Sequence, residues 1–311
     1  MKLIDITILT NIKGLGSANM AKILNYCESH NIKSLHELKN IDISKIVNKK
    51  LANTIESYLD VDIDNLYKNT QNLIDSYKND DIECISINDD RYPDILRNST
   101  NPPAILYCKG NVELLNSQCV AVIGTRENTT IGEKITSKTV EFLVQNYFTI
   151  VSGLAKGIDT IAHKTALLNQ GKAIAVLPLI DNIYPTENKQ LADEILKSGG
   201  LLISEENPNT KFFSAQLVKR DRIQSGLSNG VFVIESSING GSMHATNDAL
   251  KLKRLVFTPD IYSLGVEYQN LEQITGIKNL IDSNKSISYS SKNYHAVLKT
   301  LNQSQQKDTL L

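Results

Sequence analysis

The feature that most constrains the fold is an alternation of short apolar runs with longer amphipathic stretches, which begins near Ser117. The apolar runs are CVAVIG, FTIVSG, KAIAVLP, GLLISE, GVFVIES and RLVFTP, and they lie between residues 119 and 259. The stretches between them have the length and the apolar spacing of helices. Because strands that alternate with helices usually pair in parallel, this pattern predicts a doubly wound α/β domain with a mainly parallel sheet.

The rest of the chain divides into three further segments. Residues 1–75 show helical spacing without a convincing strand, which predicts a small helical domain. Residues 76–112 contain Pro93, Pro102 and Pro103, which favour an extended connector with short strands. Residues 113–287 hold the alternating pattern. We expect residues 288–311 to form a polar tail with one short helix at YHAVLKTL, mobile near its end.

Composition limits the classes of function. The chain has 33 Lys and Arg against 34 Asp and Glu, so any affinity for nucleic acid must come from local clusters of cations. Its four cysteines are scattered, which predicts reduced thiols rather than disulfides or a zinc site. No apolar run reaches the roughly 18–20 residues of a membrane span, and no signal cleavage site is evident. We therefore expect a cytoplasmic protein with no membrane association.

Three turns rich in small residues follow the first, second and fifth apolar runs. The first turn is GTRENTTIG (residues 124–132), the second is SGLAKGID (152–159) and the third is INGGSMHAT (238–246). The carboxyl ends of parallel strands share one edge, and each turn precedes a helix whose N-terminus favours an anion. The turns predict a phosphate site formed by Gly124, Thr125, Arg126, Ser152, Gly153, Lys156, Gly157, Gly240, Gly241 and Ser242. The alternative is that these glycines only end strands and begin helices.

A second basic cluster lies in LVKRDRIQSG, where Lys219, Arg220 and Arg222 stand close together. It is either a solvated helix face or a second row of phosphate contacts. Nearby, Phe212 and Phe213 are candidates for stacking on bases or for anchoring a loop in the core.

Catalytic motifs are absent from the sequence. It contains neither G-x-G-x-x-G nor a P-loop, so neither a nicotinamide cofactor nor ATP hydrolysis is indicated. The histidines lack metal-ligand spacing, and no G-x-S-x-G elbow is present. We expect His163 to lie in the core or on a helix surface, and Asp159 to cap or orient the helix after the second turn. The sequence thus predicts a protein that is not an enzyme and that holds no cofactor and no metal.

Several segments together resemble the DNA-processing protein A family (DprA, also called Smf). They are CVAVIGTRENTTIGEKIT, TIVSGLAKGIDTIAHKTAL, KRDRIQSGLSNGVFVIES and GGSMHATNDALKLKRLVFTP, in the order and spacing of that family. The upstream YPDILRNSTNPPAILYCKGN is similar to the family's connector. The segment IKGLGSANMAKIL is similar to its small N-terminal domain of the SAM or helix-hairpin-helix type. The resemblance covers residues 85–285.

The resemblance implies a Rossmann-like DNA-binding domain at residues 113–287. It implies a protein that binds single-stranded DNA, protects incoming DNA, forms a homodimer and loads the RecA recombinase in natural transformation and recombination. The family is not known for a catalytic reaction. Positions that match its DNA-binding cations are Arg126, Lys156, Arg220 and Arg222, and the pocket is shaped by Gly124, Ser152, Gly153 and Gly157.

The chain departs from the family pattern in several places. The family's usual RNR reads Arg220-Asp221-Arg222 here, and we expect the carboxylate either to offset the neighbouring cations or to orient one of them. LV replaces FP before this segment, and NGGSMHAT stands where SGSLIT is more typical. We also expect no full winged helix after the sheet. These departures leave the DNA pocket as the part of the resemblance that transfers best.

Two other interpretations remain open. One is a nucleotide-binding sensor or a nucleotide-processing enzyme of a related Rossmann-like fold. Such enzymes use PGGxGTxxE, and here Gly240-Gly241 lacks the matching glutamate, with Asp248 one position away. The other is an oligomeric scaffold whose glycine turns hold no ligand. The sequence also leaves open whether the setting is transformation, phage defence or general recombination.

Overall fold

The computed structural model describes residues 1–60 and 62–308. Contacts within the chain divide it into two units, Met1–Cys108 and Lys109–Leu311. The segment boundaries expected from the sequence at residues 75, 112 and 287 remain predictions.

Helices form most of the first unit. Asp5 at the start of its first helix is buried, and its carboxylate accepts hydrogen bonds from the backbone N–H groups of Lys2 and Leu35 and from the hydroxyl of Tyr67. These bonds tie three helices together. The helices are α1 (Leu3–Thr10), α2 (Ser17–Ser29), α3 (Leu35–Leu38), α4 (Lys49–Leu59) and α5 (Ile63–Asn79), with a 3₁₀ turn at Ile43–Lys45.

The proline-containing segment forms short elements, as its composition predicts. Strand β1 (Glu83–Ser86) pairs antiparallel with β2 (Ile105–Gly110), and Glu83 lies opposite Cys108. Between them, α6 (Asp94–Arg97) is a single turn that begins directly after Pro93. Proline fixes its own backbone and gives up its N–H, which suits the entry to a helix but not its interior.

A parallel sheet forms the centre of the second unit, and the doubly wound fold is confirmed. Its strands follow the order β6-β5-β4-β3-β7-β8-β9, and every neighbouring pair is parallel. All six predicted apolar runs are strands. The strands are β3 (Cys119–Ile123), β4 (Thr149–Ser152), β5 (Ala173–Val176), β6 (Leu201–Ser204), β7 (Gly230–Val233), β8 (Leu255–Pro259) and β9 (Ile287–Tyr289).

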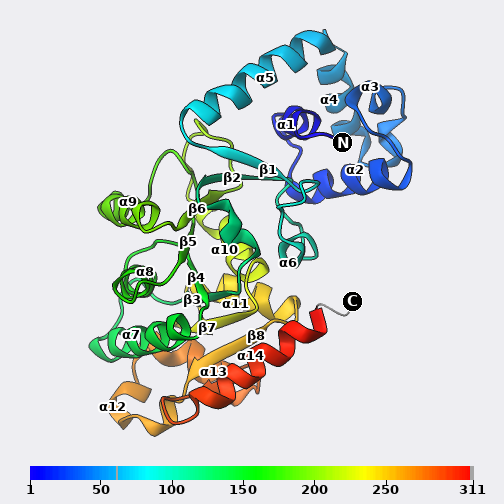
Figure 1. Cartoon of the computed structure of the whole chain (residues 1–311). Helices are drawn as coiled ribbons and strands as arrows, with labels where there is room; N and C mark the ends of the chain where they lie inside the picture. Colours follow the sequence, from blue (N-terminus) through cyan, green and yellow to red (C-terminus); the bar gives the residue numbers. More distant parts are fainter. Residues whose placement is uncertain (61, 309–311) are drawn as a thin grey trace. The chain divides into compact units, whose positions relative to one another are not determined.

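Helices cover both faces of this sheet, which is why its strands are apolar throughout. On one face lie α7 (Thr130–Gln145), α8 (Ile158–Leu168) and α9 (Lys189–Lys197), and on the other lie α10 (Ala215–Gly226) and α11 (Ser242–Lys251) (Figure 1). Shorter helices are α12 (Val266–Gln269) and α13 (Thr275–Asp282). The 3₁₀ turns are Val112–Asn116, Thr186–Asn188, Ile261–Ser263 and Glu272–Ile274.

The C-terminal segment contributes more structure than its polar composition suggests. Strand β9 pairs with β8, and α14 (Tyr294–Asp308) buries Val297 and Leu301. Tyr294 stacks on Phe142 of α7, with ring centroids 4.2 Å apart. Two apolar side chains four residues apart are enough to hold a helix against the domain. The mobility expected at the end of the chain falls partly on residues 309–311, which lie outside the described residues.

No helix within the described residues is both long enough and apolar enough to cross a bilayer.

Candidate functional site

The three small-residue turns meet at one edge of the sheet. They follow β3, β4 and β7, and the strand order places β4, β3 and β7 side by side. From β3 the chain winds through β4 and β5 to β6, whereas from β7 it winds the opposite way to β8 and β9. The crevice between β3 and β7 is therefore a topological switch point, where open α/β sheets bind their ligands.

A pocket of about 380 Å³ opens at this switch point, and we call it the main pocket. It is lined by residues of the first and third turns, by part of the second turn and by one face of α10. Sequence-predicted residues that line it are Gly124, Thr125, Arg126, Arg220, Gly240, Gly241 and Ser242, and further lining residues include Ala155, Asp159, Leu217, Asp221 and Gln224.

A smaller side cavity of about 40 Å³ shares Arg126, Ala155, Leu217 and Arg220 with the main pocket. Gly153, Lys156, Tyr184 and Pro185 complete its lining. Ser152 and Gly157 line neither cavity. The Ser152 hydroxyl donates to the carbonyl of Val122 at 2.7 Å, and Gly157 has a φ of 75°, where a Cβ would collide with the first turn. Ser152 and Gly157 therefore support the conformation of the turns without lining a cavity.

Of the cations predicted from the sequence, Arg126 is the one that has no carboxylate partner among the residues that the structure describes. It is exposed at the rim shared by the two cavities, and it makes no hydrogen bond or ion pair with any residue that the structure describes. A guanidinium presents several N–H donors in a planar fork that matches a phosphate group. Arg126 is thus placed and free to bind an anion.

Arg220 has the opposite character, since it is buried in the wall of the main pocket. Its guanidinium donates to the carbonyl of Gly153 at 3.0 Å and to the carboxylate of Asp221 at 2.5 Å, and it lies 4.0 Å from that of Asp159. A side chain at Gly153 would collide with this guanidinium. Arg220 therefore links α10 to the second turn, and its charge is largely compensated inside the protein.

The two carboxylates beside Arg220 are also buried. Burial raises the pKa of Asp221 to about 6, although the nearby Arg220 acts to lower it. Burial likewise raises the pKa of Asp159, against the effect of Arg220. Asp159 accepts the backbone N–H groups of Gly153 at 3.1 Å and Ala155 at 3.3 Å, so it orients the second turn at the start of α8. His163 on α8 is fully buried, and burial lowers its pKa to about 4, so it is neutral at neutral pH.

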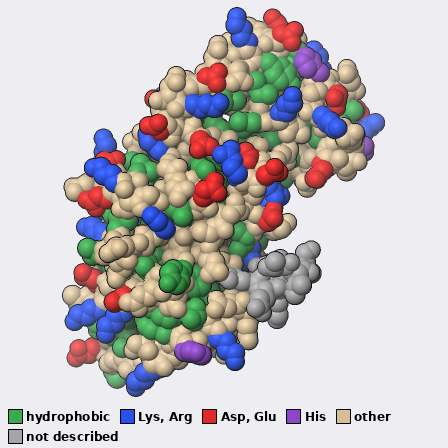
Figure 2. Space-filling view, viewed as in Figure 1, with side chains coloured by type: hydrophobic (Ala, Val, Ile, Leu, Met, Phe, Trp, Pro, Cys, Tyr) green, Lys and Arg blue, Asp and Glu red, His purple; other side chains and the backbone are tan. Residues whose placement is uncertain are grey.

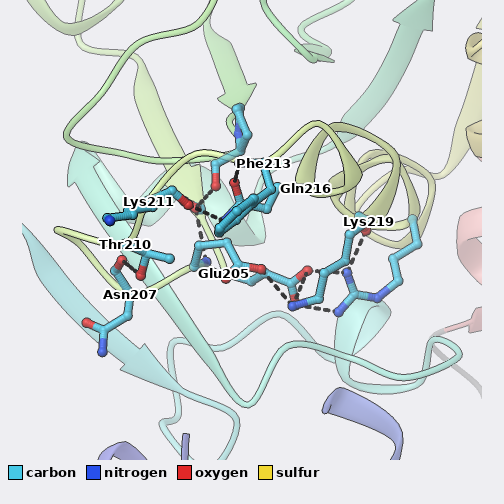
Figure 3. A network of polar contacts seen from close by, with 11 residues as sticks. Glu205, Asn207, Thr210, Lys211, Phe213, Gln216 and Lys219 are labelled. Carbon is cyan, nitrogen blue, oxygen red and sulfur yellow. Dashed lines mark hydrogen bonds and ion pairs between the residues drawn. The ribbon is translucent and has the colours of Figure 1, made fainter. Parts of the chain in front are cut away.

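The remaining predicted cations are paired with carboxylates outside the main pocket. Lys156 donates to Glu187 at 2.5 Å, and Lys219 donates to Glu206 at 2.7 Å. Arg222 binds Glu205 through both carboxylate oxygens, at 2.6 and 2.5 Å. Figure 3 shows Lys219 and Glu205 within this network. Lys219 and Arg222 line neither cavity, because the turn of α10 directs them away from the face that carries Leu217, Arg220 and Gln224.

The loop between β6 and α10 presents two aromatic rings in different ways. Phe212 stacks on Tyr184, with ring centroids 4.7 Å apart. Phe213 is 62% exposed, and its N–H donates to the buried Gln216, whose amide in turn donates to the carbonyl of Lys211 (Figure 3). Of the two roles considered from the sequence, Phe212 has the contacts of an anchor and Phe213 has the exposure that stacking on a ligand needs.

Comparison with known proteins identifies the family. Residues 83–300, more than half of the chain, match the family model described as DNA recombination-mediator protein A. The chain belongs to this family.

Individual relatives agree with this assignment. The DNA processing protein DprA of Bacillus subtilis is 34% identical over 198 residues, which are 63% of this chain and 66% of the relative. DprA of Streptococcus pneumoniae is 37% identical over 246 residues, 78% of this chain and 82% of the relative.

Solved DprA structures share the fold. The X-ray structure of the Streptococcus pneumoniae protein matches with a TM-score of 0.79 at 32% identity and covers 96% of this chain and 98% of that protein. A Helicobacter pylori DprA structure, described in terms of its single-stranded DNA binding mode, matches with a TM-score of 0.60 at 29% identity. It covers 70% of this chain and 96% of that protein. This chain is therefore a DNA-processing, recombination-mediator protein by family.

Glu235 is a residue of this DprA-family site that sequence reasoning missed. It is fully buried, and its carboxylate accepts hydrogen bonds from the Thr129 N–H at 2.9 Å, the Thr129 hydroxyl at 2.6 Å and the Tyr268 hydroxyl at 3.0 Å. Its carbonyl accepts the N–H of Thr125 at 2.7 Å. Glu235 thus holds both ends of the loop that carries Arg126. The available signal was a single glutamate in the otherwise apolar run GVFVIES.

In this DprA-family protein, internal carboxylates accept backbone N–H groups at two of the three turns, so those groups are not available to a ligand. Glu235 occupies the N-terminus of α7, and Asp159 binds the N–H groups of the second turn. At the third turn, the backbone N–H groups of Gly241 and Ser242 have no protein acceptor among the described residues, and both residues line the main pocket. The open donors of α11 and the free Arg126 therefore face the same pocket.

Charge on the surface follows the balanced composition. On the face shown in Figure 2, Lys and Arg side chains are interspersed with Asp and Glu rather than gathered into one basic surface. No group of three or more His, Cys, Asp and Glu side chains within the described residues could hold a metal ion.

Proposed function

We propose that this protein grips single-stranded DNA at the carboxyl edge of its parallel sheet and carries out no reaction on it. The observation that carries this proposal is Arg126, an exposed and unpaired arginine at the rim of a pocket lined by small-residue turns at the switch point. Membership of a recombination-mediator family and the similarity to the Helicobacter pylori protein support DNA as the ligand.

Phosphate groups are the part of the strand that the main pocket suits. Arg126 offers a charged fork, and Gly241 and Ser242 offer backbone N–H groups at the positive end of α11. Contacts of this kind fix the backbone and carry no information about base sequence. We expect binding that depends on strandedness and salt and only weakly on sequence.

Bases would stack on the exposed ring of Phe213. The residue before it in the same loop, Phe212, stacks on Tyr184. Tyr184 lines the side cavity together with Lys156. Stacking on aromatic side chains tolerates every base, because each base presents a flat π-face. A strand with unpaired bases can use this surface, whereas the bases of a duplex are already stacked on one another.

We further propose that the protein protects incoming DNA and loads the RecA recombinase onto it as a homodimer, in natural transformation and recombination in the cytoplasm. This part rests on the family and on the DprA relatives rather than on the geometry of the main pocket.

One observation favours a second candidate, a sensor or enzyme for a free nucleotide. A pocket of about 380 Å³ falls within the range of small-molecule sites, roughly 300–1,000 Å³. The pocket alone does not distinguish a nucleotide from one unit of a DNA strand.

The deciding experiment measures binding of the full chain to a fluorescent oligothymidine, to duplex DNA and to mononucleotides over a range of salt. The proposal predicts binding to the single strand above that to the duplex. The logarithm of affinity should fall with the logarithm of salt by about 0.7 for each phosphate contacted. Saturable binding of a mononucleotide without binding of the strand would favour the second candidate.

A further inference from the structure

Two kinds of ion pair hold the cations around the proposed DNA path. Arg222 and Glu205 form a bidentate pair whose side chains are 15% and 6% exposed. Lys156 and Glu187 form a single contact with side chains 57% and 61% exposed. Lys219 and Glu206 are 43% and 20% exposed, and Lys219 also lies 3.5 Å from the carboxylate of Glu205. The two arrangements have different physical consequences.

Breaking a buried bidentate pair leaves one charge without a partner and poorly solvated, which lowers stability. The Arg222–Glu205 pair is therefore structural. An exposed pair contributes little to stability, because water already solvates both charges. Lys156 can therefore leave Glu187 when a better anion arrives, and Lys219 can exchange Glu206 for that anion while it stays near Glu205. A DNA strand supplies such anions in a row.

The two carboxylates lie on the segments that carry Tyr184 and Phe213. Glu187 follows Tyr184 and Pro185, which line the side cavity with Lys156 and Arg126. Glu206 lies in the loop that begins at Glu205 and carries Phe213. The stacked rings of Tyr184 and Phe212 connect the two places. Among these cations, Arg126 alone lacks a carboxylate partner within the described residues.

We infer that Glu187 and Glu206 compete with DNA phosphates for Lys156 and Lys219, and so restrain the affinity of this protein for single-stranded DNA. The inference rests on the proposed function. Each carboxylate neutralises a lysine in the free protein, so binding exchanges one partner for another instead of adding a new ion pair. Arg126 then provides the first uncompensated contact, and the lysines join when the strand is in place.

The test measures the affinity of Glu187→Gln, Glu206→Gln and the double variant for the same oligothymidine across salt. Glutamine keeps the shape of the side chain and removes its charge. Each variant should bind about two- to fivefold more tightly, the change expected when an exposed pair is removed. The salt slope should steepen by about 0.7 in Glu187→Gln, which releases Lys156, and by less in Glu206→Gln, because Lys219 keeps Glu205 as a partner.

Two controls separate competition from a general change of charge. Glu141→Gln removes the same charge from the exposed surface of α7, away from the three turns, and should leave affinity close to that of the wild type. Lys156→Gln combined with Glu187→Gln should lose the gain, because the lysine is then absent.

Three outcomes would overturn the inference. Equal tightening by Glu141→Gln would show a general charge effect, and unchanged affinity in both glutamine variants would show that the carboxylates do not compete. In either case a wild-type protein that binds the strand leaves the proposed function standing. Absence of strand binding by the wild type would contradict both.

Discussion

At the scale of single residues, the pocket shows how a carboxylate changes what a neighbouring arginine can do. Arg220 and Arg126 both line the main pocket, but Arg220 is bound to Asp221 and to the second turn, while Arg126 is free. Residue type alone therefore did not separate a structural arginine from an available one. The carboxylate of Asp221 accounts for part of this difference.

Replacing Asp221 by asparagine should remove a pH dependence from the stability of the protein. Burial raises the pKa of Asp221 to about 6, above the value of about 3.9 in an unfolded chain. The folded protein then holds the proton more tightly, so the wild-type free energy of unfolding falls as pH rises from about 4 through about 6. We expect the stability of Asp221→Asn relative to wild type to rise by about 1–3 kcal/mol between pH of about 4 and about 7.

Urea unfolding of both proteins across this pH range gives the measurement. Their difference isolates position 221, since Arg220, Asp159, His244 and Asp248, the charged groups that act on it, are common to both. A difference that does not change with pH would contradict the burial argument.

At the scale of elements, α10 explains why neighbouring cations have different roles. Residues 219, 220 and 222 are close in sequence, yet about 100° of helix rotation per residue sends them to different faces. Leu217, Arg220 and Gln224 face the main pocket, and Lys219 and Arg222 face the loop that begins at Glu205. The sequence LVKRDRIQSG predicts a helix but does not reveal this division, because it carries no strong amphipathic pattern.

The loop between β6 and α10 should contribute through Phe213. Phe213→Ala removes an exposed ring without changing charge, so we expect a loss of about 1–3 kcal/mol in binding of an oligonucleotide, with the salt slope unchanged. Phe212→Ala removes the ring that stacks on Tyr184 and should instead lower thermal stability. Fluorescence titrations and thermal unfolding of both variants measure these effects. Unchanged affinity of Phe213→Ala would exclude stacking at this position.

At the scale of the whole molecule, the alternation of apolar runs and helices was enough to predict the sheet. Each run is short, apolar on both faces and followed by a helix, so local pattern and tertiary structure agree. The meeting of the three turns followed from parallel pairing. Strand β9 was not predicted, because ISY is short and lies in a polar segment, and its partner β8 is what makes it a strand.

Of the internal carboxylates, Asp159 was expected to cap or orient the helix after the second turn, whereas Glu235 was beyond the reach of the sequence pattern. Glu235 and Asp159 bind N–H groups at the first and second turns, which were expected to be open to a ligand. Such partners become visible only when the fold brings residues 129 and 235 together. The site consequently depends on fewer free donors than the three turns suggested, and on Arg126 most of all.

The central claim is that Arg126 is the available cation of a DNA-binding edge, and charge reversal tests it most directly. Oligothymidine binding should be compared between wild type, Arg126→Glu and Lys138→Glu, the last being a matched reversal at an exposed residue of α7. We predict that Arg126→Glu loses at least about tenfold in affinity with its fold intact, because it removes a charge-assisted contact and adds repulsion, while Lys138→Glu stays near wild type. Wild-type affinity in a folded Arg126→Glu protein would contradict the account.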